Sequence, residues 1–287
     1  MARELPRRRR FARHALALLA LTLAIACRAA PVATREAGAP EISAGDDAPL
    51  RHLRVRIAPA QTKDFEALLE RCVASAEDAS LAPEAGWLVY REPPGRYQLV
   101  WFGAPPEAGS VPPESALVTF LRTFTGRSAA DRVAELGRIE WELEWSLLLA
   151  QRAAWTSPVA LDPARHPKLR LMGRQVRPGR EDAFAEALAA RTGFLVAHGY
   201  PLPVEGFESL EGPAGFEVQA VFATDWPRFH GRDSFKAFLE RLSEAERTEY
   251  ARVKAALMAT MASADYFDAD LQPALSFPPG TSDARDP

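Results

Sequence analysis

Two stretches, HLRVRIAPAQTKDFEALLE at residues 52–70 and KLRLMGRQVRPGREDAFAEALAA at residues 168–190, decide the fold that the sequence predicts. Each begins with a short run rich in apolar and β-branched side chains, which is typical of a β-strand. The runs end at Pro59 and Pro178, because proline cannot continue a central strand. Acidic residues then open a segment with apolar residues three and four positions apart, which predicts an amphipathic helix.

The two stretches belong to a longer repeat with a constant offset of 119 residues. A gapless offset over about 65 residues indicates an internal duplication, because chance rarely keeps so many landmarks in register. The aligned pairs are Ile57 with Val176, Pro59 with Pro178, Phe65 with Phe184, Leu69 with Leu188, Pro94 with Pro213, Tyr97 with Phe216, Leu99 with Val218, Ser115 with Ser234 and Arg122 with Arg241.

Each copy continues with a candidate hairpin, a short helix and a long closing helix. We therefore expect the order strand, helix, strand, strand, helix in both copies. The fold class predicted is α+β, with two tandem ferredoxin-like repeats that form a pseudo-dimer and a long C-terminal helix in each. The hairpins fall at 86–91 with 97–103 and 206–210 with 216–223, the short helices at 113–124 and 232–241, and the long helices at 128–154 and 243–264.

This element order resembles one half of a ferredoxin-like unit. More narrowly, it resembles the dimeric α+β-barrel superfamily, which includes antibiotic-biosynthesis-monooxygenase and haem-degrading families. The resemblance covers residues 52–265 by element order, and no family-specific site motif is matched. Because two such units pair their sheets in that superfamily, the resemblance implies a pseudo-dimer within one chain, which could be a monomer.

The first 26 residues are predicted to be a signal peptide. Residues 1–14 hold six arginines against one acid, and residues 15–26 are apolar apart from one threonine. Twelve helical residues span about 18 Å, which is too short for a hydrocarbon core of about 30 Å. We therefore expect export and not a permanent membrane span. Residues 27–50 follow as a disordered tether, rich in Ala, Pro, Gly and Asp.

Cys27 is the predicted point of attachment to the membrane. The segment Ala24-Ile25-Ala26-Cys27 resembles a bacterial lipobox, although the commonest lipobox has leucine where Ala24 stands. Ordinary signal-peptidase cleavage after Ala26 is the alternative. In lipoproteins, an aspartate directly after the lipidated cysteine favours retention at the inner membrane, and this sequence has Arg28 there. The resemblance therefore implies an outer-membrane lipoprotein facing the periplasm or the cell surface.

The remaining chain divides into a first repeat at 51–160, a second at 161–273 and a disordered tail at 274–287. Without the leader it has 29 basic and 37 acidic residues, a net charge of −8. Such an acidic protein is not expected to bind nucleic acid. Cys72 lies on the apolar face of the first predicted helix, so we expect a core thiol.

The sequence contains no GxSxG elbow, HExxH, CxxC, phosphate-binding glycine loop or EF-hand loop, and it indicates no metal or particular cofactor. His52 and His166 precede the first strand of each copy; we expect solvated residues there, with a symmetric pair of ligands or bases as the alternative. Asp265, Asp268 and Asp270 are expected to lie on a solvated tail. The candidate pocket residues are Tyr90, Trp101, Trp141, Trp145, His198 and His230.

We therefore expect an exported, lipid-anchored envelope protein that acts as a non-enzymatic binding or accessory module. Its expected partners are the membrane, through the lipid, and a small apolar or aromatic ligand. The alternative is a small cofactor-independent or haem-linked monooxygenase-like enzyme of the dimeric α+β-barrel type. A purely structural lipoprotein is the third interpretation.

Overall fold

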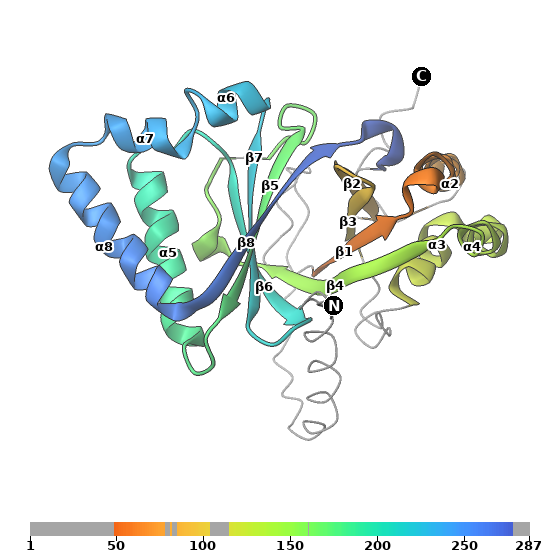
Figure 1. Cartoon of the computed structure of the whole chain (residues 1–287), viewed down its shortest axis with the longest axis horizontal. Helices are drawn as coiled ribbons and strands as arrows, with labels where there is room; N and C mark the ends of the chain where they lie inside the picture. Colours follow the sequence, from red (N-terminus) through yellow and green to blue (C-terminus); the bar gives the residue numbers. More distant parts are fainter. Residues whose placement is uncertain (1–48, 78–80, 82–84, 104–114, 160, 278–287) are drawn as a thin grey trace, which may run out of the picture. The chain divides into compact units, whose positions relative to one another are not determined.

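The computed structural model describes residues 49–77, 81, 85–103, 115–159 and 161–277. Eight antiparallel strands form one closed barrel in the order β1-β3-β2-β8-β5-β7-β6-β4 (Figure 1). The strands are β1 (Leu50–Ile57), β2 (Gly86–Glu92), β3 (Arg96–Phe102), β4 (Trp141–Gln151), β5 (Lys168–Val176), β6 (Val204–Glu211), β7 (Phe216–Ala223) and β8 (Met261–Leu271). Cys27, with the predicted leader and most of the tether, lies outside the described residues.

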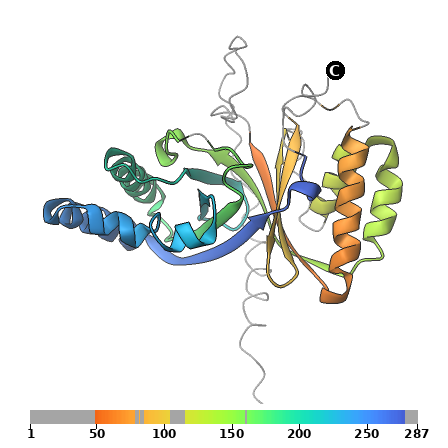
Figure 2. The ribbon, with the colours of Figure 1, turned by 90° about the horizontal axis from the view of Figure 1, so that it is seen from above.

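The longer helices lie outside the barrel, with α2, α3 and α4 on one side and α5 and α8 on the other (Figure 2). The mixed α+β class is therefore confirmed. Among the described residues, no helix has both the length and the apolar content needed to cross a membrane. The helices are η1 (Pro59–Gln61), α2 (Thr62–Glu77), α3 (Ala116–Thr125), η4 (Gly126–Ser128), α4 (Ala129–Leu136), η5 (Ala153–Trp155), α5 (Glu181–Ala197), α6 (Trp226–His230), α7 (Phe235–Arg241), α8 (Glu244–Thr260) and η6 (Pro273–Leu275).

The two halves contribute the same number of strands in the same arrangement. Within the first half the strands lie in the order β4-β1-β3-β2, and within the second in the order β8-β5-β7-β6. The halves meet where β4 pairs with β6 and where β2 pairs with β8. Both edge strands of each half therefore pair with an edge strand of the other half.

The long helix predicted over residues 128–154 is wrong in its second part. The structure has the short α4 there, followed by β4, which pairs with β1 from Trp141 to Leu149. The physical reason lies in the segment itself, because Trp141, Leu143 and Trp145 recur at every second position, the period of a strand. In the second half α8 is long, but its chain also enters a strand, β8, at Met261.

Side chains that alternate along each strand build two separate layers. On the outer face of the first half, Val55 and Tyr97 pack against α2 and α3 in a wholly buried cluster. Cys72 of α2 belongs to this cluster, so the predicted core thiol is confirmed. Burial raises the pKa of this thiol to about 12, which makes it a poor nucleophile.

The inner face of the barrel is one apolar cluster to which both halves contribute. Leu147 and Leu149 of β4 meet Leu169 and Leu171 of β5 there. The interior of an eight-stranded barrel is just wide enough for side chains or for one small ligand. This shared interior is the place where a site can form.

The chain returns to the first half after β8. The Trp87 N–H donates to the Phe277 carbonyl at 2.6 Å, and the Phe277 N–H donates back to the Trp87 carbonyl at 2.8 Å. The Trp87 indole N–H donates to the Leu275 carbonyl at 2.8 Å. Residues 274–277, the first part of the predicted tail, are therefore bound to β2.

Candidate functional site

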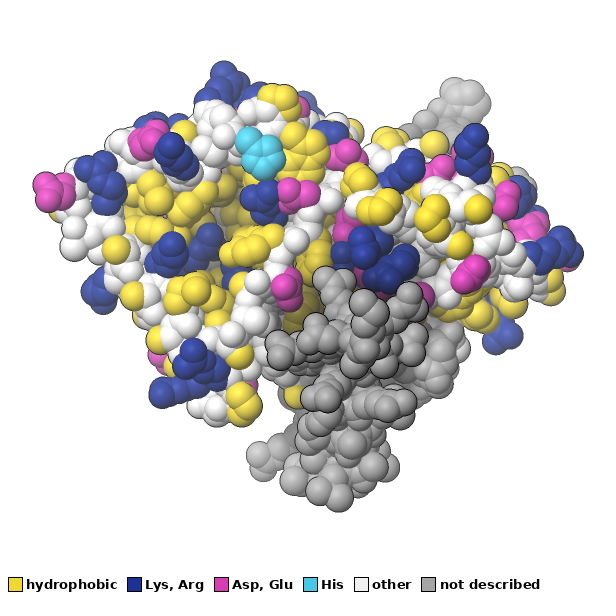
Figure 3. All heavy atoms as spheres, in the orientation of Figure 1, with side chains coloured by type: hydrophobic (Ala, Val, Ile, Leu, Met, Phe, Trp, Pro, Cys, Tyr) yellow, Lys and Arg dark blue, Asp and Glu magenta, His cyan; other side chains and the backbone are white. Residues whose placement is uncertain are grey.

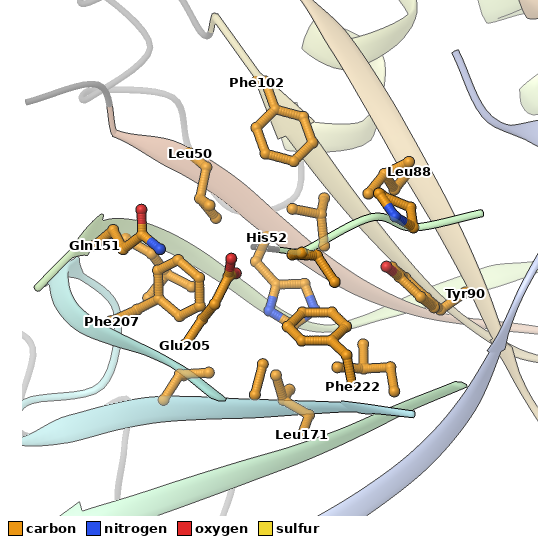
Figure 4. A pocket seen from close by; sticks show the side chains of 17 residues that line it. Leu50, His52, Leu88, Tyr90, Phe102, Gln151, Leu171, Glu205, Phe207 and Phe222 are labelled. Carbon is orange, nitrogen blue, oxygen red and sulfur yellow. The ribbon is translucent and has the colours of Figure 1, made fainter. Parts of the chain in front are cut away.

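The barrel interior contains a partly open cavity of about 70 Å³. Four polar side chains project into it, namely His52, Tyr90, Gln151 and Glu205 (Figure 4). The remaining described lining is apolar: Leu50, Leu88, Val100, Phe102, Leu149, Leu161, Pro163, Leu169, Leu171, Phe207, Val218, Ala220 and Phe222.

Glu205 is the acid of the cavity. It lies near the start of β6, and alternation places it on the same face as Phe207. No described residue forms a hydrogen bond or ion pair with its carboxyl group, and burial raises its pKa to about 7. At neutral pH this carboxyl group is therefore divided between its protonated and ionised forms, which suits a general base.

Tyr90 is a hydrogen-bond donor without a partner among the described residues. Its side chain is 1% exposed, and its phenolic oxygen is buried with no hydrogen bond. Burial raises the pKa of the phenol, and the charge of Glu205 raises it further. The hydroxyl therefore keeps its proton. A buried hydroxyl without a hydrogen bond is energetically unfavourable, so a hydrogen bond from Tyr90 to an acceptor atom of a ligand would be favoured.

His52 is held in one tautomer by the residues behind it. The ionised carboxylate of Glu92, paired with Arg54 at 2.8 Å, can only accept hydrogen bonds. The Gln98 amide nitrogen therefore faces Glu92, and its oxygen faces His52 Nε2 at 3.1 Å. It follows that Nε2 carries the proton and that Nδ1 has a free lone pair. Burial lowers the pKa of His52 to about 4, so the ring is neutral.

The expectation that His52 is solvated is wrong. The residue is 1% exposed, because β1 begins at Leu50 and its alternation turns positions 50, 52 and 54 into the barrel. His166 is not its symmetric counterpart. It lies in the loop before β5, where its Nδ1 contacts the Asp162 carbonyl at 3.0 Å.

Two of the six candidate pocket residues lie in the barrel interior. Tyr90 lines the cavity. Trp145 belongs to the interior cluster, and its ring lies edge-on to His52 with 5.9 Å between ring centroids. Trp101 and Trp141 instead pack in the outer layer of the first half.

The other two candidates lie in the second half, outside the cavity lining. His198 ends α5, and its Nδ1 lies 3.2 Å from a carboxylate oxygen of Glu246. His230 ends α6 and stacks on Trp226. The structure therefore does not bring the two histidines together with Tyr90.

The aspartates at 265, 268 and 270 lie on β8 and not on a solvated tail. Asp268 pairs with Arg170 at 2.6 Å, and Asp270 pairs with Lys168 at 3.0 Å. Basic side chains therefore already neutralise these two acids. Within the described ranges, no group of three or more His, Cys, Asp or Glu residues could hold a metal ion.

Glu205 was not among the predicted site residues, because the predicted hairpin strand began at 206, two residues after β6 begins at Val204. A signal was present: in VEGFESLE, Glu205 and Phe207 stand two positions apart on one face of a strand. Gln98 and Gln151 gave no such signal. Their roles depend on strands that pair far apart in the sequence.

Comparisons with solved structures bear on the fold. A protein from Fusobacterium nucleatum described as a "Putative monooxygenase" has a TM-score of 0.52 at 10% identity, covering 78% of this chain and 92% of that chain. The chain shares its α+β-barrel fold. A protein of the same description from Lactobacillus acidophilus has a TM-score of 0.49 at 12% identity, covering 78% and 93%. An "anthrone oxidase-like protein" has a TM-score of 0.47 at 14% identity, covering 84% and 98%. No family model and no curated protein matches the sequence.

The prediction of a non-enzymatic binding or accessory module is wrong. It required a pocket without convergent titratable groups, whereas His52, Tyr90 and Glu205 meet in one cavity. The solved structure from Fusobacterium nucleatum that shares the fold is also described as a putative monooxygenase. The findings therefore favour the enzymatic alternative.

Haem, which the resemblance to haem-degrading families implies, does not fit this cavity. The cavity is too small for the porphyrin ring, and none of the described lining residues is a Lys or Arg that could pair with a propionate. Glu205 would instead place a carboxyl group beside it. The cavity is therefore suited to an uncharged organic molecule.

Proposed function

We propose that the chain is a cofactor-independent oxygenase whose substrate is a small, apolar, ring-containing molecule with an acidic C–H bond. One observation carries this proposal: Glu205, an acid with a pKa near 7, faces the unsatisfied hydroxyl of Tyr90 across an apolar cavity. The apolar walls suit the body of such a substrate, and the two polar groups suit its reacting centre. The similar fold of the protein described as a monooxygenase supports oxygen as the co-substrate.

In the proposed reaction, the ionised carboxylate of Glu205 removes a proton from a methylene group next to a carbonyl or aryl group. The charge of the resulting carbanion is delocalised onto the neighbouring oxygen, where the Tyr90 hydroxyl donates a hydrogen bond. Molecular oxygen takes four electrons from the methylene carbon. One oxygen atom becomes the new carbonyl oxygen and the other leaves as water, so that CH2 and O2 give C=O and H2O.

The neutral His52 has a supporting role in this proposal. Its Nδ1 lone pair can accept a hydrogen bond from the substrate, and Gln98 and Glu92 prevent the ring from presenting an N–H at that position. A low pKa keeps the ring from becoming a cation in the cavity.

Oxygen consumption by the purified full chain tests the proposal, with anthrone and related activated-methylene compounds as substrates. Glu205→Gln should lower kcat about 10²–10⁴-fold, which is the usual contribution of a general base. Tyr90→Phe should lower it less, because it removes only one hydrogen-bond donor. Glu217→Gln is the matched control, because Glu217 on the neighbouring β7 also has a pKa near 7 but does not line the cavity. Equal activity in Glu205→Gln and Glu217→Gln would sink the proposal.

We also propose that the chain is exported and anchored through lipid on Cys27, in the outer membrane. The arginine-rich start, the short apolar run and the lipobox-like Ala24-Ile25-Ala26-Cys27 support this. Mass spectrometry of the membrane-fractionated protein should find diacylglycerol on an N-terminal Cys27. The variant Cys27→Ala should leave the membrane fraction, and its retention there would argue against the anchor.

We propose, thirdly, that the two halves are tandem ferredoxin-like repeats and form a pseudo-dimer. The matching strand orders of the two halves and the 119-residue offset from β1 and α2 to β5 and α5 support a duplication. A chain that supplies both halves of its own barrel should be monomeric. Sedimentation of the purified protein tests this, and a stable dimer would contradict it.

A further inference from the structure

A buried arginine without a carboxylate partner lies between the sheet and the helices of the second half. Arg174 of β5 is 4% exposed and points away from the barrel interior. Its Nη2 donates to the Gln219 amide oxygen at 2.7 Å, and it also lies 3.6 Å from the Met172 sulfur. Arg191 of α5 donates from Nη1 to the same Gln219 oxygen at 2.9 Å. Two guanidinium groups thus share one neutral acceptor.

The hydrogen-bonding capacity of this cluster is incomplete. Arg174 Nη1 and Gln219 Nε2 are both buried donors without a partner among the described residues. No Asp or Glu in the described part of the chain pairs with Arg174 or Arg191. Burial and the charge of Arg191 lower the pKa of Arg174 to about 9, which still leaves it charged at neutral pH. A buried cation without an anion is strongly unfavourable, so a partner is expected.

The first half shows that the fold does not require these polar residues. In its sheet, Leu53 lies opposite Leu99, in the place where Met172 lies opposite Gln219 in the second half. Two residues further along β1 stands Val55, at the position that Arg174 has on β5. The residues of the first half are buried in an apolar cluster. The second half thus has a buried arginine and a buried glutamine where the first half has buried valine and leucine.

The surroundings leave the charge of the cluster positive. Arg191 lies over the ring of Phe235, with 5.8 Å to the ring centroid. Tyr200 and Tyr250 are also close enough to influence the two arginines electrostatically. Figure 3 shows basic and hydrophobic side chains together over the lobe formed by α5 and α8.

We propose that Arg174, Arg191 and Gln219 form a binding site for a small oxyanion, either free or as the acidic group of an aromatic metabolite. A phosphate, sulfate or carboxylate group would accept hydrogen bonds from both guanidinium groups and from the Gln219 amide nitrogen, which satisfies the orphaned donors. The site lies on the outer face of β5 and β7, whereas the barrel cavity lies on their inner face. It is therefore separate from the proposed oxygenase site.

Thermal unfolding of the full chain at pH 7, with inorganic phosphate replacing chloride at constant ionic strength, tests the proposal. We expect a saturable rise of several degrees in melting temperature, because a ligand that binds only the native state stabilises it. Phenyl phosphate and benzoate distinguish the two sources of the anion. Half-saturation at lower concentration with these probes than with phosphate would identify an aromatic metabolite.

The matched control is the double variant Arg174→Val and Gln219→Leu, which copies the side chains of the first half. It should melt at or above the wild-type temperature without phosphate and should lose the response to phosphate. Arg191→Met, which changes a half-buried helix residue, should weaken the response at least tenfold even if the double variant does not fold. A wild-type protein that responds to phosphate no more than to chloride, or variants that respond as the wild type does, would overturn the proposal.

Discussion

At the scale of single residues, the site depends on groups whose titration is shifted by burial. Glu205 lies in an apolar cavity without a cation, whereas Glu92 and Glu144 of the same barrel pair with Arg54. The paired carboxylates stabilise the charge of their arginine. Glu205 has no such partner, so burial disfavours its ionised form.

This difference predicts a loss of stability as the pH rises through 7. Unfolded glutamate titrates near 4.5, and folded Glu205 and Glu217 titrate near 7, so the native state holds their protons in between. The contribution of the two protonated carboxyl groups to the free energy of unfolding therefore falls as the pH rises, and it levels off above about 7.5. His52 acts in the opposite direction, but only between about 4 and 6.5.

The measurement is the melting temperature between pH 6.5 and 8, followed by circular dichroism. The wild type should lose stability over this range, and Glu205→Gln should lose less. Adding Glu217→Gln should flatten the curve further. A Glu205→Gln curve parallel to that of the wild type would show that this carboxyl group titrates at its ordinary pKa.

At the scale of elements, β6 carries Glu205, and its position depends on a glycine. A Cβ added to Gly206 would lie 2.3 Å from the Trp155 Cβ and 2.8 Å from the Trp155 carbonyl oxygen of η5. The backbones of β6 and η5 therefore approach each other more closely than any other residue at position 206 permits.

Gly206→Ala should lower the melting temperature and reduce binding in the barrel cavity, because β6 must move away from η5. Gly193→Ala is the matched control. Gly193 lies within α5 with nothing within 4 Å of an added Cβ, so the change should stabilise the protein by about 0.5–1 kcal/mol. Denaturant unfolding measures both changes. A stable Gly206→Ala variant with unchanged binding would contradict the close approach of these backbones.

Local sequence patterns predicted the elements well where one periodicity dominated. The strand and helix at 52–70 and 168–190 are present because proline and the apolar spacing fix them locally. The region after Ala129 was misread, because Leu136 and the leucines of β4 also fit a helical spacing. Only the pairing of β4 with β1 and β6 distinguishes the two readings, and that pairing is long-range.

At the scale of the whole molecule, closure of the barrel makes the two halves interdependent. The interior cluster takes residues from both halves, so neither half can bury its inner face alone. Position within the closed barrel also decides the site. Tyr90 was predicted as a pocket residue from its place on a hairpin, but its meeting with Glu205 requires strands from opposite halves. No local pattern contains that information.

The halves should therefore unfold in one cooperative transition. Replacing Trp145, Trp155 and Trp226 by Phe leaves only Trp87, Trp101 and Trp141, which pack in the outer layer of the first half, so fluorescence then reports on that layer. Its transition should coincide with the one seen by far-ultraviolet circular dichroism, which reports on both halves. Two separated transitions would show that the halves are independent domains.

The connection between the halves has a consequence for stoichiometry. Leu161 and Pro163, which lie between β4 and β5, form part of the cavity wall. A barrel assembled from two separate identical chains would present two equivalent halves and no such connection. Here the single linker covers one side of a single cavity, and each half supplies different polar groups to it. Titrations with an uncharged substrate should therefore give one molecule in the barrel per chain without cooperativity, and changes in the linker should alter substrate size while all eight strands stay unchanged.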